Sequence, residues 1–225
     1  EVITIGEEET TSTTNEAPVH TYYKYSLTEM IYTAEEIENA GGGAGTINSI
    51  SFHYALNNQK DFSVVVFMKH VTRSNFPATT TFETLTASDV VYDGTMSVSS
   101  PGWVTIELAS PFEYNGEENL LIAFDNNTGS YIGSSGSFYY TTASNTLYRY
   151  QSDITNPDPY NFNSYSASTV SSSRPNLKLD ITTTPVACAK PKGLTATDVT
   201  ARAATLDWTK GSDDQDTWEI YLTQS

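Results

Sequence analysis

Five segments of the chain have the hydrophobic pattern of β-strands. In three of them apolar and polar side chains alternate, as Ile50, Phe52 and Tyr54 do with serine and histidine between them. This period of two places the apolar side chains on one face of a strand and the polar ones on the other. The other two are continuous apolar runs, which predict strands that are buried on both faces. The alternating segments are residues 49–54, 103–108 and 176–181, and the continuous ones are residues 62–68 and 119–124.

One short helix is predicted among these strands, over residues 33–40. Thr33 is a suitable N-cap residue, and Glu36 three positions later completes a capping box. The three glycines at 41–43 are predicted to end the helix. Strand segments separated by short turns dominate the rest of the pattern. The sequence therefore predicts an all-β fold in the form of a jelly-roll-like β-sandwich.

The pattern changes after residue 181. Residues 182–192 contain three threonines and two prolines, a composition that resists a packed strand and is typical of a linker. A new strand pattern begins after this segment. We therefore divide the chain into a jelly-roll-like β-sandwich over residues 1–181, a linker over 182–192 and a second domain over 193–225.

The second domain carries short pieces of an immunoglobulin-like pattern. Leu206 and Trp208 alternate onto one face of a strand, and Trp218, Ile220 and Leu222 do so on the next. The pieces are Pro191, Leu194, Val199-Thr200, Ala204–Trp208 and Trp218–Tyr221. On them the segment resembles the start of a fibronectin type III domain, in which a tryptophan at the place of Trp208 fills the core. A complete module has about seven strands and this segment supplies at most three, so a truncated, partial fibronectin type III (immunoglobulin-like) domain is expected.

The chain is strongly acidic. Among its 225 residues, 27 Asp and Glu face 11 Lys and Arg, which gives a net charge of −16 at pH 7. Such a surface repels nucleic-acid phosphates and anionic lipids, so the sequence predicts no nucleic-acid binding. There is no run of about 20 apolar residues, so no membrane insertion is predicted. The single cysteine, Cys188, cannot form an intrachain disulfide.

Residues 1–181 carry a second resemblance, in pieces spread over the domain. They are Val2–Gly6, Tyr22–Leu27, Ile31–Ile37, Gly45–Ile50, Gly102–Ile106, Pro111–Gly116 and Asn119–Gly129. On these pieces the domain resembles a β-sandwich repeated in large surface and secreted proteins of Bacteroidetes, similar to the cleaved-adhesin domains of gingipain-type proteins. The resemblance implies an extracellular or cell-surface location, neighbouring domains in a larger chain, and a role in cell adhesion or carbohydrate binding. No signal peptide is read in the sequence, and a secreted fragment without its leader is compatible with this.

The sequence contains none of the usual catalytic constellations. The histidines His20, His53 and His70 lack the spacing of zinc ligands, and we expect the first in a loop and the others at solvent-facing strand positions. Four glutamates near one hairpin are the remaining candidates, since glycoside hydrolysis needs two carboxyl groups about 5 to 9.5 Å apart. On so acidic a chain carboxylates come together by chance, so we expect a protein that is not an enzyme. The four are Glu107, Glu113, Glu117 and Glu118.

A tyrosine- and asparagine-rich segment follows the glycine- and serine-rich residues 129–137. Aromatic faces that pack on sugar C–H groups, beside polar groups for the hydroxyls, are the chemistry of glycan binding. Alternation places Tyr148 and Tyr150 on one face of a strand, either exposed or in the core. A glycan or a host or cell-surface protein is the expected partner of this segment. Its candidate ligand-binding residues are Tyr139, Tyr140, Tyr148, Arg149, Tyr150, Tyr160, Asn161 and Tyr165.

Oxygen-bearing side chains gather at the end of one apolar run. Asp125, Asn126 and Asn127 offer carboxylate and amide oxygens, and Asp153 and Asp158 offer more in a later loop. Oxygen ligands of this kind suit Ca²⁺. The other interpretation is an Asx-rich turn, in which these side chains bind their own backbone. Structural calcium is the cofactor that the sequence suggests.

The sequence thus favours a non-catalytic, extracellular adhesion or carbohydrate-binding module of a larger surface or secreted protein. Two alternatives stay open: a structural spacer that presents another domain and has no ligand, and an accessory domain of a secreted peptidase or glycosidase. A binding module should present at least two solvent-facing aromatic side chains flanked by polar groups. A spacer should bury its tyrosines.

Overall fold

The computed structural model describes residues 1–7, 10–78, 81–133, 135–162, 168–183, 190–211 and 217–218. The chain forms two compact units, Glu1–Thr184 and Pro185–Ser225. The first unit is a β-sandwich, and the described part of the second is a two-stranded sheet. Among the described residues, no helix is long and apolar enough to cross a membrane.

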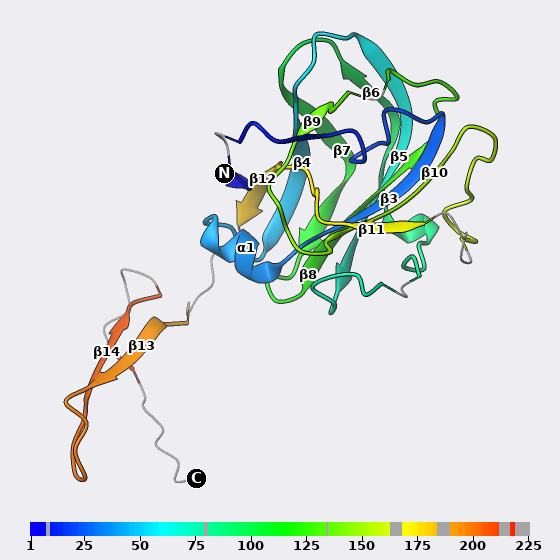
Figure 1. Ribbon diagram of the computed structural model, residues 1–225. Helices are drawn as coiled ribbons and strands as arrows, with labels where there is room; N and C mark the ends of the chain where they lie inside the picture. The colour runs from blue at the N-terminus through cyan, green and yellow to red at the C-terminus, as the bar shows by residue number, and fades with distance from the viewer. Residues whose placement is uncertain are drawn as a thin grey trace. The chain divides into compact units, whose positions relative to one another are not determined.

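The sandwich consists of two antiparallel sheets of six strands each (Figure 1). Sheet A has the order β1-β12-β4-β9-β2, and β7 pairs with the other edge of β4. Its strands are β1 (Val2–Ile5), β2 (Thr13–Thr14), β4 (Gly45–Tyr54), β7 (Gly102–Tyr114), β9 (Phe138–Tyr139) and β12 (Leu177–Thr183). Sheet B has the order β11-β10-β3-β8-β5-β6. Its strands are β3 (Tyr25–Tyr32), β5 (Lys60–Val71), β6 (Val90–Val98), β8 (Asn119–Asn126), β10 (Leu147–Ser152) and β11 (Thr169–Ser171). The predicted all-β sandwich is confirmed.

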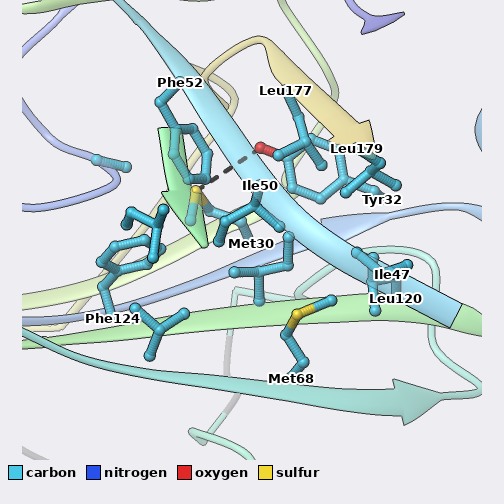
Figure 2. Close-up of a cluster of buried hydrophobic side chains, with 14 of the residues drawn as sticks. Met30, Tyr32, Ile47, Ile50, Phe52, Met68, Leu120, Phe124, Leu177 and Leu179 are labelled. Carbon is cyan, nitrogen blue, oxygen red and sulfur yellow. Dashed lines mark hydrogen bonds between the residues drawn. The ribbon is translucent and has the colours of Figure 1, made fainter. Parts of the chain in front are cut away.

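The main core lies between the two sheets. Ile50 and Phe52 of β4 point into it with the leucines of β12, as the alternation in the sequence predicts. Phe52 of sheet A meets Phe124 of sheet B edge to face, with ring centroids 5.5 Å apart. The hydroxyl of Tyr32 donates to the carbonyl oxygen of Pro175 at 2.8 Å and lies 3.9 Å from the sulfur of Met30 (Figure 2). The buried hydroxyl of Tyr32 therefore has a hydrogen-bond partner.

The predicted helix is present as α1 (Ala34–Asn39), and both hydrogen bonds of its capping box are formed. Glu36 also binds the buried Arg174, whose guanidinium nitrogens lie 2.5 and 3.0 Å from the two carboxylate oxygens. Burial raises the pKa of Glu36, but hydrogen bonds and charge from Arg174 outweigh it, so the pKa is lowered. Gly41 has a φ of +95°, which favours glycine and ends the helix as predicted. A short 3-10 helix, η1 (Ala87–Asp89), precedes β6.

The two continuous apolar runs differ in burial. In β8 every residue from Leu120 to Asn126 is buried, because β8 lies inside sheet B with cover on both faces. In β5 the prediction of burial on both faces is wrong for the first half, where Ser63 is exposed and Val65 is only partly buried. Both faces are buried only along residues 66–68.

The second unit contains β13 (Lys192–Thr197) and β14 (Thr205–Thr209), which pair antiparallel. Trp208 is partly buried, and its ring meets that of Trp218 edge to face at 5.5 Å. The predicted linker, residues 182–192, shares Thr182 and Thr183 with β12 and Lys192 with β13. Cys188 lies outside the described residues, as do Ile220 and Leu222. The resemblance to a fibronectin type III domain stays a prediction.

Candidate ligand-binding face

The tyrosine-rich segment packs into a second core on the outer face of sheet B. Tyr148 and Tyr150 of β10 have only 7% and 5% of their surface exposed. The ring of Tyr148 lies 4.3 Å from that of Phe82, and the ring of Tyr150 lies 5.2 Å from that of Phe162. The two phenylalanines come from the loops that follow β5 and β10, so these loops cover the sheet. We call this outer surface of sheet B the covered face. Neither tyrosine can contact a ligand unless the loop that covers it moves away from the sheet.

The other candidate ligand-binding residues in and after β10 lie apart from one another. Arg149 is held by Glu16, with an N–O distance of 2.6 Å, and is mostly buried. The ring of Tyr160 is half exposed and rests its edge on Phe67 at 5.8 Å. Asn161, next to it, is exposed. These three side chains do not form one aromatic patch.

Two of the remaining nominated tyrosines lie near β9. Tyr140 is partly exposed, and its backbone forms an isolated bridge with Pro175. Tyr165 lies outside the described residues. Tyr139 is partly exposed on the outer side of sheet A, where it joins two residues that were not nominated from the sequence.

Tyr139, His53 and Trp103 form an aromatic row across three strands of sheet A. The ring of His53 lies 4.6 Å from that of Tyr139 and 4.8 Å from that of Trp103. His53 and Trp103 are stacked, with an angle of 13° between their planes. They are direct partners in the pairing of β4 with β7, which brings side chains 50 positions apart in the sequence together. The row lies on the outer surface of sheet A, which we call the open face.

A shallow depression of about 370 Å³ lies beside this row on the open face. The ammonium group of Lys178 sits 4.3 Å from the centre of the Trp103 ring, a favourable cation–π distance. The hydroxyls of Ser51 and Thr105 are 2.9 Å apart and hydrogen-bonded. Donors and acceptors thus lie next to an aromatic surface. The depression is lined by Ser51, Trp103, Thr105, Glu107, Lys178 and Asp180, among others.

Two carboxylates, those of Glu107 and Asp180, line the depression on the open face. The carboxylate of Asp180 forms an ion pair with the N-terminal ammonium group of Glu1, at an N–O distance of 3.4 Å. Glu107 is exposed. Among the described residues, no group of three or more His, Cys, Asp or Glu side chains could hold a metal ion. Glu113 binds the hydroxyl of Thr46 at 2.9 Å. The carboxylate of Glu118 accepts a hydrogen bond from the side chain of Asn115, three residues earlier, at 2.8 Å.

The three histidines lie apart from one another. His20 is buried in a loop, where burial and the charge of Arg149 lower its pKa to about 3. His53 is part of the aromatic row. His70 accepts a hydrogen bond from the backbone of Asn115 at 3.1 Å, and burial lowers its pKa. The loop position of His20 agrees with the sequence, and the other two are partly buried strand residues.

The predicted oxygen-rich site lies at the end of β8. Asn126 forms an Asx turn, in which its side-chain oxygen accepts from the backbone of Thr128 at 3.1 Å. Asn127 donates to the carboxylate of Asp125 at 2.7 Å. The turn interpretation therefore accounts for the side-chain oxygen of Asn126, while its amide nitrogen is buried without a hydrogen-bond partner among the described residues. Asp125 is buried, and its second oxygen has no hydrogen-bond partner among the described residues.

Sequence reasoning passed over Trp103 and His53, although one signal was present. The alternation in residues 103–108 places Trp103 on the same side as Thr105 and Glu107, so a large aromatic side chain stands on a polar strand face. The pairing of β4 with β7 and the arrival of β9 beside β4 are long-range events. No local pattern indicates them.

Comparison with known proteins adds no relative: no family model, no curated protein and no solved structure matches this chain. The resemblance to the Bacteroidetes surface domains therefore stays a prediction based on the sequence.

Proposed function

We propose that the sandwich is a non-catalytic carbohydrate-binding or adhesion module and that its ligand lies on the open face. The observation that carries the proposal is the aromatic row of Tyr139, His53 and Trp103 beside a shallow depression lined with hydroxyl, carboxylate and ammonium groups. This is the chemistry of sugar recognition: C–H groups pack on an aromatic ring while nearby polar groups bind hydroxyls. An extracellular or cell-surface location would fit this role.

The geometry favours a neutral glycan over a strongly acidic one. Lys178 supplies one positive charge, but Glu107 and Asp180 line the same depression. A densely anionic ligand would meet these carboxylates and a protein of net charge −16. Because the depression is shallow, it would bury only part of a sugar chain. Binding should therefore be weak for a single site and should increase when several modules act together.

A glycan array with the whole chain tests this proposal. The wild-type protein should be retained on at least one neutral glycan, and Trp103→Ala should reduce its affinity about fivefold or more, since stacking on an aromatic ring is worth about 1 kcal/mol or more. Tyr131→Ala is a matched control, because Tyr131 is an exposed aromatic residue outside the row. Loss of binding in Tyr131→Ala with full binding in Trp103→Ala would move the site away from the open face.

A structural spacer is the second candidate, and the burial of Tyr148 and Tyr150 favours it. Two of the tyrosines nominated for binding serve the second core instead. A wild-type protein that binds no glycan and no cell-surface protein, while folding normally, would support a spacer or an accessory domain of a secreted enzyme.

A further inference from the structure

Only one of the two carboxylate oxygens of Asp125 has a hydrogen-bond partner among the described residues. The residue is 4% exposed, at the end of the central strand β8. One oxygen accepts from the side chain of Asn127 at 2.7 Å. The other, Oδ1, is buried and has no hydrogen-bond partner among the described residues. A buried carboxylate oxygen without a partner is costly, so its environment calls for an explanation.

The charges around Asp125 increase this cost. The carboxylates of Asp158 and Asp93 are the charged groups that act on it most, and both are negative. Asp93 lies in the same cross-strand row, two strands away through Val65. Asp158 belongs to the loop that follows β10. The protein charges that act on this group are thus negative.

Glu29 on the same covered face shows how the protein satisfies a buried carboxylate by itself. Both of its oxygens accept from the backbone of Glu83, at 2.9 and 3.2 Å. Positive charges of Arg73 and Lys69 also act on it. Asp125 Oδ1 has neither a backbone donor nor a cationic side chain as a hydrogen-bond partner among the described residues. The contrast indicates that something outside the described chain completes Asp125.

Other oxygen atoms lie close to this position. The side-chain oxygen of Asn127 accepts from Asn156 at 2.5 Å, which joins the end of β8 to the loop after β10. In that loop, Asp158 accepts from the backbone of Tyr160 at 3.0 Å. Ile154 in the same loop is 91% exposed, whereas Pro157 is buried.

We propose that Asp125 Oδ1 is a ligand of a bound Ca²⁺ ion, completed by Asp158 and by amide and backbone oxygens of residues 153–162 in the loop after β10. Three carboxylates do not converge here, so neutral oxygens must supply most of the ligands. Ca²⁺ accepts such mixed and irregular sets of six to eight oxygens, whereas Mg²⁺ requires near-ideal octahedral geometry. The ion would provide the positive charge that the site lacks. It would also tie the loop that holds Phe162 to the sheet beneath it.

Thermal unfolding of metal-free whole chain, with calcium chloride or magnesium chloride as the only addition, tests the site. At 5 mM, Ca²⁺ should raise the melting temperature of the wild-type protein by about 5 °C and Mg²⁺ by less than about 1 °C, because a ligand that binds only the folded state stabilises it. Terbium, a calcium substitute, should show luminescence sensitised by the nearby tyrosines.

Two variants and one control decide the outcome. Asp125→Asn and Asp158→Asn should each lose the calcium shift and the terbium signal, and Asp61→Asn, an exposed residue on β5, should keep both. If Asp125→Asn does not fold, the exposed Asp158→Asn gives the answer alone. A wild-type protein that is insensitive to Ca²⁺, or a full calcium shift in Asp158→Asn, would overturn the site. Trp103→Ala should keep the shift, because the ion site does not depend on the proposed glycan site.

Discussion

The two outer faces of the sandwich are built from strands with similar alternation, but loops cover the outer face of sheet B and leave the outer face of sheet A open. On sheet B, Tyr148 and Tyr150 lie under phenylalanines from two loops and form a second core. On sheet A, Trp103 and its neighbours line an open depression. The strand pattern is the same in kind, so the loops determine which face stays available. Binding residues should therefore be sought on the face that the loops leave uncovered.

The largest expected effect is on the covered face. Phe82→Ala removes a ring that contacts Tyr148 at 4.3 Å and Phe162 at 4.6 Å, so it should lower the free energy of unfolding by about 3 kcal/mol. Chemical denaturation monitored by circular dichroism measures this loss. Phe82→Leu, which keeps much of the volume, should cost clearly less. A loss below about 1 kcal/mol for the alanine variant would mean that the loop does not form a real core with sheet B.

Glu29→Gln should have a smaller effect that depends on pH. Burial raises the pKa of Glu29 well above its usual value. The folded state therefore binds this proton more tightly than the unfolded state does, and stability falls as pH rises above about 4.5. The glutamine variant lacks this loss, so at pH 8 it should be more stable than wild type. The difference should vanish near pH 4, and unfolding curves at the two pH values measure it. If the glutamine variant is destabilised equally at both pH values, the hydrogen bonds of Glu29 contribute more to stability than its buried charge costs.

The smallest expected effect is on the open face. Trp103→Ala should change the free energy of unfolding by less than about 1 kcal/mol, because the side chain is only partly buried and its loss opens no closed cavity. The same denaturation experiment compares it directly with Phe82→Ala. Equal losses in the two variants would remove the distinction between the faces.

Local patterns in the sequence predicted the helix α1 and the strands β4, β5, β7, β8 and β12, but not the other strands of the sandwich. The capping box of Thr33 and Glu36 is a local arrangement, and it is formed as predicted. The inward side of β4 also follows from alternation alone. The outward side does not, because a polar or aromatic residue there can face solvent or a loop from elsewhere in the chain.

The candidate site illustrates the limit more sharply. Tyr148 satisfies the composition rule for a sugar site but lies beneath Phe82, a residue 66 positions earlier in the sequence. Trp103 becomes a candidate only when the pairing of β4 with β7 places His53 beside it. Asp125 was selected for its oxygens, but the absence of a partner for one of them is visible only in three dimensions.

The pairing of β1 with β12 has a mechanical consequence. The two strands are antiparallel, with Val2 opposite Asp180 and Ile5 opposite Leu177. Residue 1 and residue 181 therefore lie at the same end of the pair, where the backbone of Ile181 donates to the carbonyl of Glu1 at 2.8 Å. Tension applied through these two points would load the hydrogen bonds one after another, as in opening a zipper, instead of all at once. A pulling force should thus detach β1 before it disturbs the packed sheets.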